Sequence, residues 1–195
     1  MRIISGKKRG TVLDCPEGGK VRPSADRVRE GLFNILASGR YGDVLSSPII
    51  ADIFAGVGSL GLEAWSRGHL NGGALQVIFV EKDRDALISL NTNIKKVGLG
   101  DSTHVITRDA TSKLIWPADK AGLVFLDPPW IHNDGDDDLA FMALENLKAL
   151  DAFEEGAIIS IEHDYRRPAK LPGQFEYLDT RKWGKTACTL ARFNG

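Results

Sequence analysis

A glycine-rich stretch, residues 52–61, has the residue types and the spacing to hold a nucleotide-like ligand. Its glycines, Gly56, Gly58 and Gly61, follow an apolar run and precede a helical pattern, in the arrangement G-x-G-x-x-G. Glycines at such a turn let the backbone bend tightly and approach a ligand, and the third lets the helix pack close to the sheet. The pattern predicts a binding loop for a dinucleotide or for another nucleoside-containing cofactor.

Residues near this loop help to separate the two cofactor classes. Asp52 stands directly before the loop, where a carboxylate suits the ammonium and sulfonium groups of S-adenosylmethionine and would repel a pyrophosphate. Glu81, after the next apolar run, is placed to bind ribose hydroxyls in either class. Asp109 is placed to accept a hydrogen bond from an adenine amino group, and Ala110 leaves room for the ring. Together these positions favour S-adenosylmethionine.

The most specific signal is the run Asp127-Pro128-Pro129-Trp130, which follows a fourth apolar run. Two consecutive prolines fix φ and have no backbone donors, so they would hold the Asp127 carboxylate and the Pro128 carbonyl rigidly as two acceptors. Acceptors for both protons of a planar exocyclic amine favour a more pyramidal nitrogen, whose lone pair then points at a methyl donor. Trp130 is suited to stack on an unstacked base. The run predicts methyl transfer by positioning, without a nucleophile or a metal.

This motif is similar to the Asp-Pro-Pro-aromatic signature of methyltransferases that modify amino nitrogens of adenine, cytosine, guanine or glutamine. Essentially the whole chain resembles one bacterial family among them, the 16S rRNA guanine-N2 methyltransferases (RsmD-like). The matching runs are Arg2-Ile-Ile-Ser-Gly6-Lys7, Arg9-Gly10, Arg22-Pro23-Ser24, Asp26-Arg27-Val28-Arg29-Glu30, Phe33-Asn34, Phe54-Ala55-Gly56, Gly58, Leu60-Gly61-Leu62-Glu63-Ala64, Ser66-Arg67-Gly68 and Phe79-Val80-Glu81-Lys82-Asp83. Two departures are Trp130, where Tyr is usual, and the run Lys182-Trp183-Gly184-Lys185, where the family tends to show a Tyr-Gly pair.

The resemblance implies a class I methyltransferase that transfers a methyl group from S-adenosylmethionine to the N2 amino group of a guanine in 16S rRNA. It implies that Phe54, Ala55 and Lys82 complete the cofactor site, and that the N-terminal segment contacts ribosomal RNA or the small subunit. Residues 1–40 carry nine Lys and Arg against four Asp and Glu, whereas residues 41–195 carry 16 against 22. The candidates for phosphate contacts are Arg2, Lys7, Arg9, Arg22, Arg27 and Arg29.

The order of apolar patterns predicts an α/β fold. Buried strands are expected at residues 49–54, 77–80, 104–107, 123–126 and 157–161, and helices at 25–36, 60–66, 84–97 and 139–150, with Ser24 as the first N-cap. This alternation predicts a doubly wound, mostly parallel sheet with helices on both faces. An antiparallel pair at 175–179 and 186–193 would complete the seven-stranded, Rossmann-like sheet of class I methyltransferases.

A β-hairpin is expected from residues 1–5 and 11–14, ahead of the first helix. We therefore divide the chain into a basic N-terminal extension, residues 1–40, and a methyltransferase domain, residues 41–195, which together form one compact unit.

Composition excludes several other classes of protein. The 195 residues are 43% hydrophobic and 26% charged, as in a compact globular domain. Cys15 and Cys188 lie far apart, so neither a disulfide framework nor a zinc site is expected. No apolar run has the length of a membrane span or of a signal peptide core. We expect a monomeric, cytoplasmic protein with no metal and no membrane contact.

Three alternatives stay open at the level of the sequence. A methyltransferase for adenine N6 or another amino group, acting on DNA or a different RNA, would use the same motif, because the motif chemistry does not read the ring. An NAD-dependent oxidoreductase would use the glycine loop and Glu81 but would leave residues 127–130 without a role. A catalytically silent RNA-binding protein would keep the fold, although the acidic residues at the strand ends disfavour it.

Overall fold

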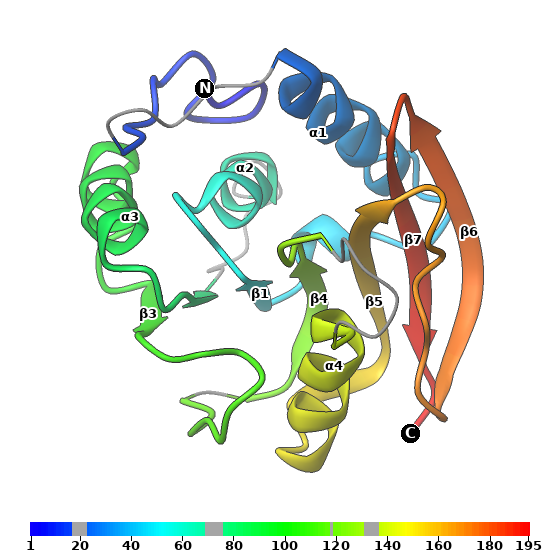
Figure 1. Ribbon diagram of the computed structural model, residues 1–195. Coiled ribbons are helices and arrows are strands. Elements are labelled where there is room, and N and C mark those ends of the chain that lie inside the picture. The colour runs from blue at the N-terminus through cyan, green and yellow to red at the C-terminus, as the bar shows by residue number, and fades with distance from the viewer. Residues whose placement is uncertain (17–22, 69–75, 118, 131–136) are drawn as a thin grey trace.

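The computed structural model describes residues 1–16, 23–68, 76–117, 119–130 and 137–195 (Figure 1). In these residues a seven-stranded sheet has the strand order β3-β2-β1-β4-β5-β7-β6. The strands are β1 (Ile49–Ile53), β2 (Gln76–Val80), β3 (Thr103–Ile106), β4 (Ala121–Leu126), β5 (Phe153–Asp164), β6 (Phe175–Trp183) and β7 (Thr186–Phe193). The helices are α1 (Pro23–Leu36), α2 (Ser59–Gly68), α3 (Arg84–Val97) and α4 (Leu139–Ala149), with a short 3-10 helix η1 (Val44–Ser46).

The strand directions confirm the predicted doubly wound, mostly parallel sheet. Strands β1 to β5 pair in parallel, and β7 pairs antiparallel with both β5 and β6. The strand order reverses between β1 and β4, so the carboxyl ends of these two central strands form the crevice in which ligands bind to such sheets. The glycine loop follows β1 and the Asp-Pro-Pro-Trp run follows β4, so the fold brings the two motifs together.

Helices cover the two faces of the sheet unequally. In Figure 1, α1, α2 and α3 form an arc on one side, and α4 lies on the other. One core cluster joins side chains of α1–α3 to one face, including Leu32, Leu62 and Ile94. The second joins α4 to the opposite face, through side chains such as Leu144 and Leu147. Because β1, β2 and β4 are covered on both faces, they are apolar nearly throughout, as the sequence analysis assumed.

The limits of several elements differ from expectation, and β6 extends to Trp183 rather than to residue 179. Helix α1 begins at Pro23, so Ser24 lies in its first turn and the prediction of Ser24 as N-cap is wrong. Proline is favoured there because its fixed φ suits a helix. The N–H that it lacks would have no acceptor within the first turn, so no hydrogen bond is lost. Strand β5 begins at Phe153 rather than Ala157, and the pairing with β4 shifts register between Ala121 and Leu123, near Gly156 with its φ of +78°.

The predicted N-terminal hairpin is present in a reduced form. Arg2 and Val12 make an isolated antiparallel bridge, and the Ile3 N–H donates to the Thr11 carbonyl at 3.0 Å. Ile3 and Leu13 are buried in the same core cluster as α1–α3, so the extension shares a core with the rest of the chain. Within the described ranges, no helix combines the length and the apolar character that a bilayer span requires.

Candidate functional site

The glycine loop between β1 and α2 has an unusual backbone. Phe54 directly follows β1 and has a φ of +64°, and Gly56 and Gly58 have φ values of +54° and +82°. A Cβ on Gly58 would lie 2.5 Å from Leu90 Cδ1, and one on Gly61 would lie 2.6 Å from Phe79 Cε1. At Gly56 a Cβ would meet nothing within 4 Å, so this side of the loop faces open space. The loop therefore packs tightly on the protein and leaves its outer backbone accessible to a ligand.

Asp52 lies under the loop rather than beside it. Its side chain is 1% exposed and accepts a hydrogen bond from the Gly61 N–H at 2.8 Å, at the start of α2. Burial raises the pKa of Asp52 to about 8, and the nearby charges of Asp127 and Glu81 add to the increase, while the Gly61 hydrogen bond opposes it. A cation bound nearby would stabilise the ionised form of this carboxyl group.

Glu81 joins the loop to the turn after β2. One carboxylate oxygen accepts from the Gly56 N–H at 2.7 Å, and the other accepts from the N–H groups of Lys82 and Asp83 at 2.7 and 2.8 Å. The oxygen that accepts from Gly56 has a further lone pair, so the carboxylate can still accept from a ribose hydroxyl. Glu81 thus sets the distance between the two walls of the crevice.

The next pair, Lys82 and Asp109, spans the ends of β2 and β3. Lys82 Nζ lies 2.7 Å from Asp109 Oδ2, and the Thr111 N–H donates to Asp109 Oδ1 at 2.9 Å. These hydrogen bonds, with the one from Lys82 first, lower the pKa of Asp109 to about 2. Ala110 is buried behind them. The two residues predicted separately for the cofactor therefore form one ion pair.

The Asp-Pro-Pro-Trp run begins where β4 ends beside β1. Leu126 is paired with Ile53, and the Asp127 N–H donates to the Ile53 carbonyl at 3.4 Å. Asp127 and Pro129 are exposed, Pro128 is buried and Trp130 is half-buried. The negative charge of Asp127 adds to the effect of burial in raising the pKa of Asp52, and, after burial and Glu162, in raising the pKa of Cys188 in β7. Asp127 therefore lies at the carboxyl edge of the sheet, between the glycine loop and the β5–β7 pair.

These residues fit a cationic nucleoside cofactor such as S-adenosylmethionine. Asp52, Glu81 and Asp127 lie close enough for each of the last two charges to raise the pKa of the first, and the loop in front of them has an open backbone. With its pKa of about 8, Asp52 is largely protonated near neutral pH, and a ligand with ammonium and sulfonium groups would favour its ionised form, whereas a pyrophosphate would disfavour it. Across the described ranges, no three or more His, Cys, Asp or Glu side chains are grouped to hold a metal.

Three of the arginines predicted to contact RNA line one groove. The groove, of about 420 Å³, lies between the hairpin and α1, and Arg2, Arg9 and Arg27 are all exposed on it. Gly10 contributes backbone, and Asp26 and Glu30 are also in the lining. Positive side chains from two separate segments therefore converge on one concave surface.

The other three predicted RNA contacts have different positions. Lys7 is exposed, and its N–H donates to the Ser66 carbonyl at 2.9 Å, so the hairpin turn presents this side chain. Arg29 is only 3% exposed, and its Nη2 donates to the Arg2 carbonyl at 2.7 Å and to Asp26 at 3.0 Å. Arg29 is thus committed to holding the hairpin on α1, and we leave it out of the proposed RNA contacts. Arg22 lies outside the described residues.

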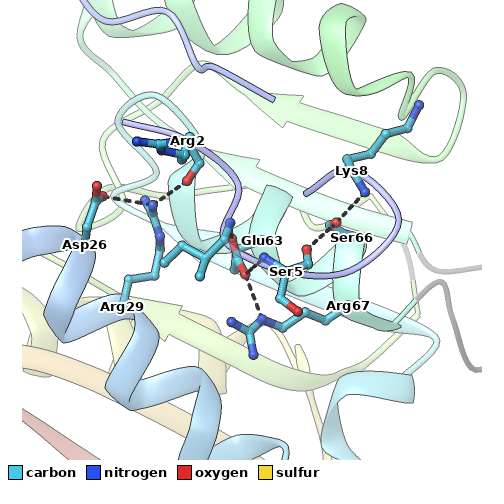
Figure 2. A network of polar contacts seen from close by, with 9 residues as sticks. Arg2, Ser5, Lys8, Asp26, Arg29, Glu63, Ser66 and Arg67 are labelled. Carbon is cyan, nitrogen blue, oxygen red and sulfur yellow. Dashed lines mark hydrogen bonds and ion pairs between the residues drawn. The ribbon is translucent and has the colours of Figure 1, made fainter. Parts of the chain in front are cut away.

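A buried acid that the sequence analysis did not assign anchors the extension (Figure 2). Glu63 of α2 is fully buried and accepts from the Ile4 N–H at 2.7 Å, the Ser5 N–H at 3.0 Å and Arg67 Nε at 2.7 Å. One turn on, Ser66 Oγ accepts from the Lys8 N–H at 2.9 Å. The signal was a charged residue on an otherwise apolar face, among Leu62 and Trp65.

A second unassigned residue, Asn93, connects the extension to the glycine loop. It is fully buried in α3; its Oδ1 accepts from the Asp14 N–H at 2.7 Å, and its Nδ2 donates to the carbonyls of Asp14 and Val57, each at 3.0 Å. Val57 stands between the first two glycines of the loop. One amide thus sets the position of both segments. Its signal in the sequence was an Asn at a core-facing position beside Ile94.

The fold and the site are those of the Rossmann-like α/β methyltransferases. The family model described as conserved hypothetical protein 95 matches residues 1–192. The chain belongs to this family, the RsmD-like methyltransferases that its motifs resemble.

Individual relatives agree with this assignment. YlbH of Bacillus subtilis, named for rRNA methylation, is 34% identical over an alignment that covers 100% of both chains. Ribosomal RNA small subunit methyltransferase D of Escherichia coli K12 is 38% identical over 130 residues, which cover 67% of this chain and 60% of the relative. Among solved structures, YhhF of Escherichia coli, named as a methyltransferase, superposes with a TM-score of 0.79 at 29% identity, covering 100% of this chain and 98% of that one.

Proposed function

We propose that this chain transfers a methyl group from S-adenosylmethionine to the N2 amino group of a guanine in small-subunit ribosomal RNA. The observation that carries the proposal is the position of Asp127-Pro128-Pro129-Trp130, at the end of β4 and beside the acid-lined end of β1. The relatives named for small-subunit rRNA methylation supply the RNA substrate class. A substrate in the ribosome places the activity in the cytoplasm.

The cofactor would occupy the crevice between the glycine loop and the ends of β2 and β3. Phe54, Ala55, Gly56 and Gly58 would provide backbone around it, and Glu81 would accept from its hydroxyl groups. Asp52, buried under the loop, would act on its cationic groups through its charge. The pair Lys82–Asp109 and the small side chain of Ala110 would hold the adenine. When bound, the cofactor supplies an electrophilic methyl group.

The protein's part in the transfer is to position and polarise the target amine. The Asp127 carboxylate and the Pro128 carbonyl accept hydrogen bonds from its two N–H groups, which makes the nitrogen lone pair available in line with the methyl group. Pro128 is buried, so the backbone of the run is held in place, and Asp127 is exposed, so its carboxylate is accessible to the substrate. Trp130 stacks on the guanine after it has left its neighbours. As the bond between nitrogen and the methyl carbon forms, the carbon–sulfur bond would break and leave S-adenosylhomocysteine. Asp127 can then accept the one surplus proton of the methylated nitrogen and pass it to solvent.

The RNA around the target base would bind the groove between the hairpin and α1. Arg2, Arg9 and Arg27 provide positive charge there, and Lys7 extends it along the hairpin. Contacts of this kind fix the register of the RNA and do not read its bases. The choice of the guanine then depends on the crevice at Asp127.

Radiolabelled methyl transfer to small ribosomal subunits that lack their native methylation tests this function. The comparison includes wild type, Asp127→Asn and, as a matched control, Asp151→Asn, which changes an exposed aspartate paired with Lys120. We expect label in N2-methylguanosine with wild type and the control, and a loss of at least about a hundred-fold with Asp127→Asn.

Other outcomes select the alternatives. Label in another nucleoside would support a different amino methyltransferase. Absence of transfer to subunits, free rRNA and DNA, despite tight binding of S-adenosylmethionine, would support a catalytically silent RNA-binding protein.

A further inference from the structure

A second surface at the carboxyl edge of the sheet has the chemistry to bind RNA. It consists of the start of the β5–β6 connection and the β6–β7 turn, and we call Tyr165, Arg166, Lys182 and Lys185 the β-edge patch. All four side chains are exposed, Tyr165 by 41%. The run Lys182-Trp183-Gly184-Lys185 is one of the places where the sequence departs from the family pattern, and the proposed function gives it no role.

Local contacts hold the two parts of the β-edge patch together. Asp164, the last residue of β5, is paired with Thr186, and the Tyr165 N–H donates to the Lys185 carbonyl at 3.0 Å. Lys182 Nζ lies 3.3 Å from the centroid of the Tyr165 ring, a cation–π contact. The patch is thus an aromatic ring and ammonium groups at fixed positions on paired strands.

The charge of the β-edge patch is not cancelled by its acid. Arg166 makes a close ion pair with Asp164, at 2.6 Å, and this pair is locally neutral. Lys182 and Lys185 are therefore the excess positive charge beside Tyr165. Arg166, Lys182 and Lys185 outnumber the single acid Asp164, and an exposed aromatic ring beside this net positive charge suits a single-stranded nucleic acid, in which bases stack on rings and phosphates bind cations.

The position of the β-edge patch connects it to both parts of the proposed site. The charge of Asp127 acts on Cys188, which is paired with Glu162, and Tyr165 and Lys185 of the patch lie three residues beyond this pair, about 10 Å away. On its other side, Trp183 packs so closely on α1 that a Cβ on Gly31 would lie 2.5 Å from its Cζ2. Arg27, which lines the groove, is one turn before Gly31. The patch therefore lies at the same edge of the sheet as Asp127 and is joined through Trp183 to α1, which borders the groove.

We propose that the β-edge patch binds the RNA strand next to the target nucleotide, with a base on Tyr165 and phosphates on Lys182 and Lys185. This inference rests on the proposed function, because it assigns the patch to the same RNA. The groove and the patch hold the strand on the two sides of the nucleotide that enters the crevice.

Binding of in vitro transcribed small-subunit rRNA tests the proposal. The double variant Lys182→Gln/Lys185→Gln is compared with Lys120→Gln/Lys148→Gln, which removes two lysines from the start of β4 and from α4. For the patch variant we expect the Kd for RNA to rise about ten-fold, and the slope of log Kd against log salt to fall by about 1.4, for two phosphate contacts. The Kd for S-adenosylmethionine stays at the wild-type value in both variants.

The ring is tested separately by Tyr165→Ala and Tyr165→Phe. Alanine removes the stacking surface and weakens RNA binding about ten-fold, whereas phenylalanine keeps it and binds as wild type. The proposal is wrong if the lysine variant matches its control in Kd and salt slope. It is also wrong if the variant binds assembled subunits less tightly but free rRNA normally, because the partner is then a ribosomal protein. Failure of wild type itself to bind rRNA would instead overturn the proposed function.

Discussion

Two buried carboxylates, Asp52 under the glycine loop and Glu63 under the hairpin, are used in opposite ways. Glu63 accepts two backbone N–H groups and an arginine, so its charge is compensated within the protein. Asp52 has one hydrogen bond, from Gly61, and the acids Asp127 and Glu81 nearby, and its pKa is about 8. A compensated buried carboxylate fixes one segment to another, whereas an uncompensated one keeps its proton near neutral pH and is suited to release it when a cationic ligand binds.

Replacement of Glu63 by alanine should have the largest effect on stability. The change leaves the N–H groups of Ile4 and Ser5 and the guanidinium of Arg67 without their acceptor, which costs about 3–5 kcal/mol in the free energy of unfolding. Urea unfolding measures it. Glu145→Ala, which breaks a surface ion pair with Lys148 in α4, is the control and should cost less than about 1 kcal/mol. Equal losses in the two variants would mean that Glu63 is not an anchor.

Replacement of Asn93 should have the next largest effect on stability, because Asn93 contacts both the N-terminal extension and the glycine loop. Asn93→Ala removes hydrogen bonds to Asp14 and to Val57, and the expected loss in unfolding free energy is about 2 kcal/mol. The Kd for S-adenosylmethionine should also rise several-fold, because Val57 belongs to the glycine loop. Asn91→Ala, on the exposed side of the same helix, is the control for both measurements. A wild-type Kd for the cofactor in the Asn93 variant would show that Asn93 holds the hairpin but does not position the cofactor site.

The pH dependence of stability should distinguish Asp52. Its pKa is about 8 in the folded protein and about 3.9 in an unfolded chain. Between these values the folded state holds a proton that the unfolded chain has lost, so this group makes stability fall as pH rises from about 4 to about 8. The contribution is at most about 1.4 kcal/mol per pH unit. Urea unfolding of wild type and Asp52→Asn across this range should show a steeper decline for wild type; parallel curves would contradict the assignment.

The smallest effect is expected at the pair Lys82–Asp109. Its lysine side chain is 65% exposed, and solvent screens such pairs, so Lys82→Met should change the unfolding free energy of the cofactor-free protein by less than about 1 kcal/mol. A loss in unfolding free energy as large as that of Glu63→Ala would show that the Lys82–Asp109 pair also stabilises the fold. The same unfolding series provides the measurement.

Sequence patterns predicted the sheet and the positions of the two motifs because both depend on local signals. Apolar runs and glycine spacing mark the strands and the loop, and parallel strands bring their carboxyl ends to one edge. The patterns did not show that Asp52 bonds to Gly61, nine residues away, or that Arg29 turns inward to Arg2. The sequence gives the charge of a side chain, but its orientation and partners depend on how the chain packs.

The residues that tie the extension to the domain were missed for a related reason. The contacts of Glu63 with Ile4 and of Asn93 with Asp14 join positions 59 and 79 residues apart, and no periodicity reports such pairs. What the sequence did contain was a polar residue at a core-facing helical position, which marks a buried polar group that requires partners. It identifies the residue and leaves its partners unknown.

The position of β7 within the sheet has a consequence for how the chain folds during synthesis. Because β7 lies between β5 and β6, β6 has no strand to pair with until residues 186–193 have left the ribosome. The segments that line the hairpin groove and the glycine loop precede this point, and the β6–β7 turn forms last. A nascent or truncated chain would therefore have the groove before it has the β-edge patch, and would expose the edge of β5 to pairing with other chains.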